Sequence, residues 1–151
     1  MLGDCYPCRM TAHIDELPPR EKIFMQGGWR IAHAFNSALP GWLVLVPTRH
    51  VTGLDELTTA ESEELGLLAH RASVALKSVT GCSKTYLMLF AEAEGFSHLH
   101  VHVVPRMPDL APEVTGPRVF AFLGEDETVW VSDADQDAVS LRLRSALAVA
   151  R

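Results

Sequence analysis

The run from residue 98 to residue 104, in which three histidines alternate with apolar residues, constrains the fold more than any other stretch of the chain. Successive side chains of a β-strand point to opposite faces of the sheet, so this alternation predicts a strand with all three histidines on one face. The intervening apolar residues then point into a core and hold the strand rigidly. The histidines of this row are His98, His100 and His102.

Three imidazoles on one face indicate chemistry rather than packing, because each ring has two nitrogens that need partners and protonated neighbours repel. One interpretation is a catalytic zinc site, since three convergent imidazoles supply the ligands of an open zinc centre. Another is nucleophilic attack on phosphorus by the middle histidine, which is mostly neutral near pH 7. The spacing is compatible with both.

Four further strands are predicted from β-prone apolar runs bounded by glycine and proline. The run at 42–46, which ends at Pro47, has the continuous apolar character of a central, buried strand. The remaining strands are expected at 22–25, 29–33 and 85–90, with a peripheral hairpin formed by 119–123 and 128–131.

Two helices follow from end signals and apolar periodicity. Thr58 and Glu61 have the spacing of a capping box, which predicts a helix over about 59–80 that stops at Gly81. Ser132 is expected to cap a last helix. Its predicted apolar face consists of Val139, Leu143, Ala146 and Leu147.

Length and charge narrow the functional classes. With 151 residues and 48% hydrophobic residues, the chain has the size of one domain with a sizeable core. Its net charge of -6 opposes the phosphate attraction that drives general nucleic-acid binding. No apolar run approaches the roughly 20 residues that span a bilayer, and the N-terminus lacks the order of a secretory signal. We therefore expect a cytoplasmic protein that binds neither nucleic acid nor membrane.

The cysteines indicate a metal knuckle more than a disulfide framework. Cys5 and Cys8 form a Cys-x-x-Cys pair, which is either a pair of free thiols or half of a metal site. His50 and His98 are candidates for the other half, because two thiolates and two imidazoles make the closed tetrahedral set of structural zinc. Cys82 is expected to be a buried, inert thiol.

The triad of histidines, followed by apolar residues and Pro105-Arg106, resembles the histidine triad (HIT) superfamily of nucleotide hydrolases and transferases. Residues 39–51 are similar to its Pro-Gly turn, buried strand and Pro-x-x-His segment. The resemblance covers about 20–106 and is nearest to bacterial zinc-containing, diadenosine polyphosphate hydrolase-like members.

The resemblance implies an α+β fold with a central antiparallel sheet, one main helix packed on it and a C-terminal helix, usually as a homodimer. We interpret residues 1–151 as a single domain of this kind. It would comprise an N-terminal zinc knuckle at about 1–20, a catalytic core at about 20–106 and a C-terminal extension at about 107–151.

The resemblance also implies roles for the triad. His100 matches the nucleophile that attacks the α-phosphorus of a nucleotide, after which water cleaves the nucleotidyl-histidine. His102 matches the residue that contacts the phosphate and helps the leaving group, where uridylyltransferases usually have glutamine. His98 would orient His100 or bind metal. Structural zinc, with no organic cofactor, is expected on Cys5, Cys8, His50 and His98.

The sequence departs from the HIT pattern at the predicted nucleotide cleft. Most HIT hydrolases carry an acidic ribose-binding residue before the Pro-Gly turn, but here either Asn36 replaces it or the ribose contact is lost. His33 is a candidate for lining the cleft. Ser97 is either a phosphate donor or a small residue before a strand.

The loop 91–97 is acidic in place of the family's neutral segment. Glu92 and Glu94 would repel a polyphosphate unless they face solvent or bind through a metal ion. Outside the cleft, His13 and His70 are expected on the surface. The tryptophans are expected in the core rather than stacked on a base; they are Trp29, Trp42 and Trp130.

These features favour a nucleotidyl hydrolase that cleaves a nucleoside 5′-phosphate at its α-phosphorus. A nucleotidyltransferase with an acceptor other than water is the close alternative. A non-catalytic HIT-fold module that binds a nucleotide or a partner is a second, and a hydrolase with zinc on the three triad histidines is a third.

Overall fold

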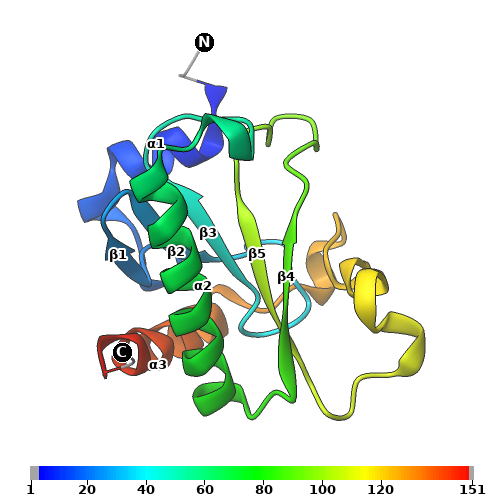
Figure 1. The fold of residues 1–151 in the computed structure, drawn as a ribbon. Helices are drawn as coiled ribbons and strands as arrows, with labels where there is room; N and C mark the ends of the chain where they lie inside the picture. The colour runs from blue at the N-terminus through cyan, green and yellow to red at the C-terminus, as the bar shows by residue number, and fades with distance from the viewer. Residues whose placement is uncertain (1–3, 150–151) are drawn as a thin grey trace.

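A computed structural model describes residues 4–149. Its centre is a five-stranded antiparallel sheet in the order β1-β2-β3-β5-β4 (Figure 1). The α+β class and the antiparallel sheet expected from the sequence are confirmed. The strands are β1 (Phe24–Gln26), β2 (Trp29–His33), β3 (Leu43–Pro47), β4 (Lys84–Leu89) and β5 (Val101–Arg106).

Both long helices begin where their capping residues predict, and the main helix also ends where predicted. The Thr58 hydroxyl accepts a hydrogen bond from the Glu61 amide, and Gly81 closes the main helix at a φ of 72°. Within residues 4–149, no helix is both long and apolar enough to cross a membrane. The α-helices are α1 (Tyr6–Ala12), α2 (Thr59–Thr80) and α3 (Asp133–Val149).

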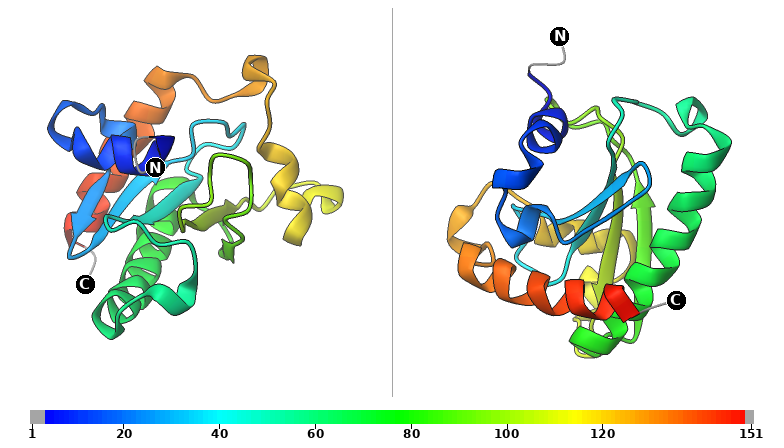
Figure 2. Two further views of the ribbon diagram at one scale, coloured as in Figure 1. Left: turned by 90° about the horizontal axis from the view of Figure 1, so that it is seen from above. Right: turned by 90° about the vertical axis from the view of Figure 1, so that its left-hand side faces the viewer.

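Both long helices pack on one face of the sheet and enclose the main core (Figure 2). Every second residue of the central strands points into this core, for example Leu43 and Leu45 on β3. Burying each such side chain stabilises the fold by about 1.5–3 kcal/mol. The helices contribute the buried residues Leu68, Ala72, Ala75, Leu76, Leu143 and Leu147.

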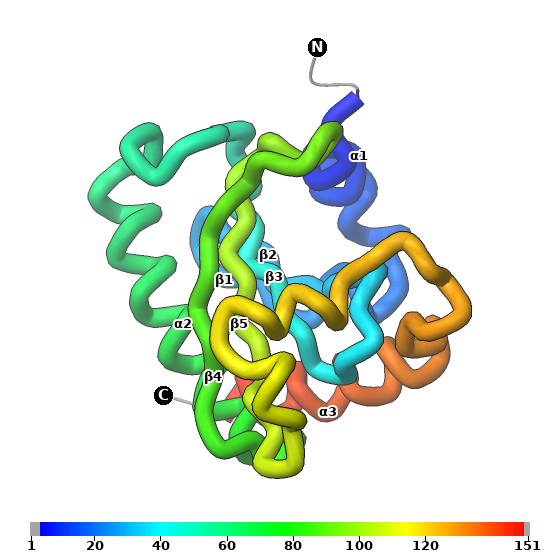
Figure 3. Tube along the Cα trace, turned by 90° about the vertical axis from the view of Figure 1, so that its right-hand side faces the viewer, coloured from blue at the N-terminus to red at the C-terminus, as the bar shows by residue number. Residues whose placement is uncertain are grey.

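The segment 107–131 covers the opposite face, together with α1, as Figure 3 shows. A smaller apolar cluster forms there around Trp42, Val104 and Val119. Because this cover reaches only part of the sheet, the two faces differ: one is a packed core and the other holds a cavity.

The predicted hairpin at 119–123 and 128–131 is wrong. Both stretches form short 3-10 helices, over Gly116–Phe122 and Glu127–Val129. Pro117 lies in the first turn, where its fixed φ suits a helix. The consecutive residues Val119 and Phe120 both pack on the second cluster, which a strand's alternation does not allow.

Gly41 provides a test of how the Pro-Gly turn positions β3. Its φ is +86°, and a Cβ there would lie 3.3 Å from side-chain carbons of Leu76 and Thr80. Because left-handed backbone costs an L-residue about 1–2 kcal/mol, Gly41→Ala is expected to lower the free energy of unfolding by at least that much. Urea unfolding measures it.

Gly66 is the matched control, because it lies in the middle of α2 with nothing within 4 Å of an added Cβ. Gly66→Ala should raise stability by up to about 1 kcal/mol through helix propensity. Equal effects of the two substitutions would contradict the assignment of Gly41 to a conformation that requires glycine.

Candidate active site and metal cluster

The cavity on the open face has a volume of about 730 Å³, within the usual range of small-molecule sites. Its floor is the sheet, where Ala32, Val44 and His102 form one row across β2, β3 and β5. His100, two residues before His102 in the chain, also lines the cavity. Aromatic rings form much of the wall, namely Tyr6, Phe35, Phe90, Phe96, Phe120 and Trp130.

His98 lies before the strand rather than on it, because β5 begins at Val101. The expected row of three histidines is therefore corrected to a pair on the cavity face and one ring turned aside. The His98 Nε2–H donates to the Pro47 carbonyl over 2.9 Å. The next amide, of Leu99, bonds to the carbonyl of Val51 (2.8 Å), so these residues are tied to the 47–51 segment instead of the ladder.

The ring of His100 is held in one tautomer. Its Nδ1 lies 2.8 Å from the His98 carbonyl oxygen, which only accepts, so Nδ1 carries the proton. The lone pair of the neutral ring is then on Nε2. Since His100 lines the cavity, this arrangement provides a nucleophilic nitrogen at the site.

The neutral ring of His102 carries its proton on the other nitrogen. The indole Nε1–H of Trp42 donates to its Nδ1 over 2.9 Å, so the proton of the neutral ring is on Nε2. Burial, with a smaller contribution from the charge of His100, lowers the pKa of His102 to about 4. The ring is therefore a neutral hydrogen-bond donor at pH 7, with its centroid 5.0 Å from that of His100.

The three residues that sequence reasoning considered for substrate contact occupy different places. His33 and Asn36 line the cavity, but both ring nitrogens of His33 are already bonded, to the Ala34 carbonyl and the Gly41 amide. Ser97 is exposed and does not line the cavity. Trp29 and Trp42 are buried as expected, whereas Trp130 is half-buried on the cavity wall, so its core assignment is wrong.

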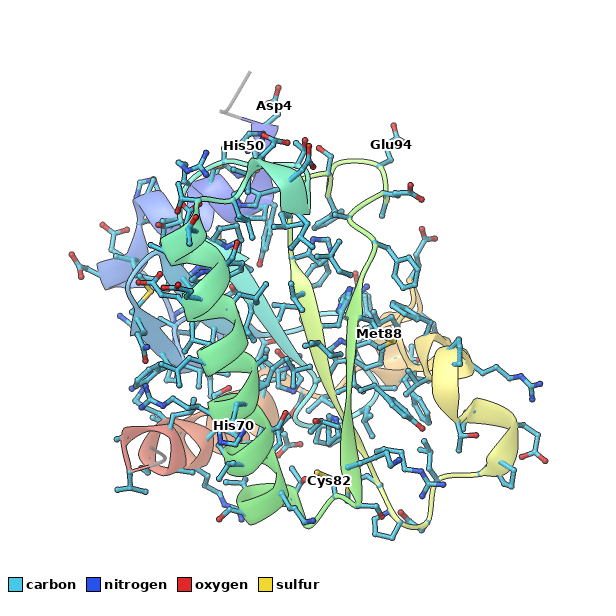
Figure 4. The ribbon with its side chains drawn as sticks, viewed as in Figure 1. Asp4, His50, His70, Cys82, Met88 and Glu94 are labelled. Carbon is cyan, nitrogen blue, oxygen red and sulfur yellow. The ribbon has the colours of Figure 1, made fainter. Side chains whose placement is uncertain are left out.

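The acidic loop 91–97 lies at the mouth of the cavity. Glu92 and Glu94 are exposed, and Figure 4 shows Glu94 pointing away from the molecule at the tip of the loop. Exposed carboxylates are hydrated and screened, which reduces their repulsion of a phosphate chain. His13 and His70 are exposed, and Cys82 is buried, as expected.

A second group of side chains gathers next to the triad. The ligand atoms of Cys5, Cys8, His50 and His98 lie within 4.8 Å of one another, and no other such His, Cys, Asp or Glu group occurs among residues 4–149. Figure 4 shows His50 at the N-terminal end of the molecule. The alternative zinc site on all three triad histidines has no counterpart in the described residues.

The geometry of this cluster fits tetrahedral zinc. The Sγ atoms of Cys5 and Cys8 lie 3.3 and 3.4 Å from Nδ1 of His98, and Cys8 lies 3.4 Å from Nδ1 of His50. Zinc bonds of ordinary length at tetrahedral angles separate sulfur and nitrogen by about 3.6 Å. Burial and the neighbouring Cys5 thiol raise the pKa of Cys8 to about 11, so the Cys8 thiolate needs a cation to form.

Sequence reasoning missed a charged group on the cavity floor. Arg30 is 1% exposed and donates from Nη1 to the backbone and the carboxylate of Glu21, over 2.7 and 3.3 Å. The Tyr6 hydroxyl donates to the same carboxylate over 2.6 Å. One signal was visible beforehand: an arginine inside an otherwise apolar strand.

Residues 18–109 match the HIT domain family. The chain belongs to this family. Among curated proteins, the AP-4-A phosphorylase of Mycobacterium tuberculosis H37Rv is 42% identical to this HIT protein in an alignment of 106 residues that covers 66% of the chain. The match covers 54% of that relative, so the chain spans about half the length of the curated relatives it matches.

Two solved structures illustrate the shared HIT fold. A zinc-bound histidine triad family protein from Mycobacterium smegmatis has a TM-score of 0.69 at 18% identity, over 98% of this chain and 96% of that one. A uridylyltransferase mutant has a TM-score of 0.67 at 21% identity, over 97% of this chain and 48% of that one. At these identities the likeness concerns the fold.

The buried ring of His33 predicts a pH-dependent stability. Burial lowers its pKa to about 4 in the folded state, whereas the unfolded value is near 6.5. The unfolded state therefore binds the extra proton between these values, and stability falls as the pH drops below 6.5. From pH 7 to pH 5, His33 should account for a loss of about 2 kcal/mol, measured by urea unfolding.

His33→Gln should remove this contribution, so that its loss between the two pH values is smaller than that of the wild type. His70→Gln, on the exposed side of α2, is the control and should keep the wild-type dependence. An identical pH dependence in all three proteins would refute the assignment.

Proposed function

We propose that this HIT protein is a nucleotidyl hydrolase, with His100 attacking the α-phosphorus of a nucleoside 5′-phosphate that is linked to a leaving group. The observation that carries the proposal is the hydrogen bond from His100 Nδ1–H to the His98 carbonyl, which leaves the lone pair of this cavity-lining ring on Nε2. Histidine forms covalent intermediates of this kind because its neutral nitrogen is nucleophilic near pH 7.

The reaction has two steps. In the first, a bond forms between His100 Nε2 and the α-phosphorus, and the bond from phosphorus to the leaving group breaks with its electron pair on the leaving group. We assign the stabilisation of that charge to the His102 Nε2–H, a neutral donor whose ring centroid lies 5.0 Å from that of His100. In the second, the oxygen of a water molecule forms a bond to phosphorus, and the bond from phosphorus to His100 Nε2 breaks with its electron pair on Nε2. The proton that water loses passes to solvent, so the nucleoside monophosphate leaves and the His100 ring is neutral again.

An acceptor other than water defines the second candidate function. It is favoured by the 42% identity to the M. tuberculosis AP-4-A phosphorylase, although about half of that relative is covered. With inorganic phosphate as acceptor, the product would be a nucleoside diphosphate instead of a monophosphate. Product analysis with and without phosphate therefore separates the two reactions.

The activity proposal predicts that His100→Ala lowers turnover by about 10⁴-fold or more, because removal of a nucleophile abolishes its covalent pathway. The assay is release of nucleoside monophosphate from a panel of nucleoside phosphoramidates and dinucleoside polyphosphates. Nucleotide binding should persist, because the other cavity residues are unchanged. His70→Ala, on the exposed surface, is the matched control.

Wild-type-like turnover by His100→Ala would contradict the covalent mechanism. Nucleotide binding by the wild type without turnover of any member of the panel would instead support the binding-module alternative. The homodimer and the cytoplasmic location expected from the sequence stay predictions, as does the division into knuckle, core and extension.

We also propose that Cys5, Cys8, His50 and His98 hold a structural zinc ion. The set is closed, with four protein ligands, and the His98 Nε2–H bond to Pro47 leaves Nδ1 free to bind metal. When bound, zinc would tie the N-terminal segment to the residues before β5. The ion takes no part in the chemistry above.

This proposal predicts that the wild type contains about one zinc ion per chain, and that Cys5→Ser with Cys8→Ser reduces it to near zero. Elemental analysis of the purified proteins measures the content. Cys82→Ala is the matched control, because that thiol is buried away from the cluster and should leave the zinc content unchanged. Zinc retained after loss of both N-terminal cysteines would refute the assignment.

A further inference from the structure

The proposed mechanism uses one end of the cavity and leaves the buried ion pair on its floor without a role. Arg30 points to the same sheet face as His102, because it lies two residues before Ala32, which shares a row with that histidine. His100 likewise lies two residues before His102. Because β2 and β5 run in the same direction, Arg30 and His100 both lie on the same side of this row.

The position of Arg30 matches the reach of a nucleotide. One strand, β3, separates β2 from β5, which sets the two backbones about 10 Å apart. Val46 pairs with Arg30 and is the small residue between them on the cavity face. A nucleoside 5′-phosphate with its phosphorus at His100 is long enough to reach across Val46 to Arg30.

The cavity that Arg30 lines has aromatic walls that suit a flat ligand. The Tyr6 ring lies 5.6 Å from the Phe35 ring and 6.0 Å from the Phe96 ring, and Trp130 packs edge-on against Phe35 at 5.8 Å. All of these rings line the cavity. Aromatic walls of this kind bind nucleobases by stacking.

The free hydrogen-bonding capacity of the ion pair lies on the arginine. Nε of Arg30 is buried without a partner, and its hydrogen bonds to described residues all come from Nη1. The carboxylate oxygens of Glu21 each accept already, one from Tyr6 and one from Arg30. A ligand here meets donors, and because Glu21 neutralises the charge, a neutral acceptor suits the site better than a phosphate.

We propose that Arg30 is a specificity-determining residue that donates hydrogen bonds to the base of the nucleotide and selects a 6-oxopurine such as guanine. Guanine places two acceptors side by side, O6 and N7, which pair with a guanidinium. Adenine carries an amino group in place of O6, and that donor would face the donors of Arg30. This inference rests on the proposed nucleotide substrate and names its base.

The test is equilibrium binding of GMP, AMP and ribose 5-phosphate to the zinc-loaded protein by calorimetry. The wild type should bind GMP at least about ten-fold more tightly than AMP. Arg30→Met should remove this preference by weakening the binding of GMP, with little change in the affinities for AMP and ribose 5-phosphate. Arg142→Met, on the exposed side of α3, is the matched control and should behave as the wild type.

Because Arg30→Met leaves Glu21 buried without its partner, the double variant Arg30→Met with Glu21→Gln guards against misfolding. Both variants are checked for thermal unfolding and zinc content, and the double variant should also lack the preference. Arg30→Lys keeps the charge but loses the planar donor pair. The difference in log Kd between GMP and AMP should therefore fall to less than half of the wild-type difference.

Three results would overturn the proposal: equal binding of GMP and AMP by the wild type, equal weakening of all three ligands in Arg30→Met, or no binding of any nucleotide. The second would assign Arg30 to phosphate binding or to the fold. Selective GMP binding without turnover of guanosine substrates would refute the proposed activity and leave this inference standing.

Discussion

Two hydrogen bonds from imidazoles to backbone carbonyls determine what the rest of the site does. His98 donates to Pro47 and His100 donates to His98, so each ring has its second nitrogen free on the opposite side. For His98 that nitrogen faces the thiols, and for His100 it faces the cavity. One short segment before β5 therefore presents one imidazole to the Cys5 and Cys8 thiols and another to the cavity, and no atom is needed by both.

Local features of the structure were predictable because their causes are local. The Thr58–Glu61 capping box, the glycine that ends α2 and the proline that ends the buried strand each act within a few residues. The grouping of Cys5, Cys8, His50 and His98 was also predictable, although its members are far apart in sequence. Two thiols and two imidazoles together have few roles other than binding a metal ion. Their chemical character therefore allowed the group to be predicted without knowledge of the fold.

The features that sequence reasoning missed depend on contacts between distant segments. The pairing of Arg30 with Glu21 needs the turn before β1 to fold back over β2, and its link to Tyr6 needs α1 to reach the sheet. No local pattern encodes either contact. Likewise, the short helix at Gly116–Phe122 brings both Val119 and Phe120 onto apolar partners, which only the folded sheet provides.

The seven-residue helix α1 belongs to two structures at once. Cys8 lies in it and Cys5 immediately precedes it, while Tyr6 and Pro7 form part of the cavity wall. An ion that holds this helix in place also holds that wall, and a ligand that packs against the wall favours the helix position that completes the ion's coordination. Coupling between two binding sites is reciprocal. If bound metal increases the affinity for nucleotide by some factor, bound nucleotide increases the affinity for metal by the same factor.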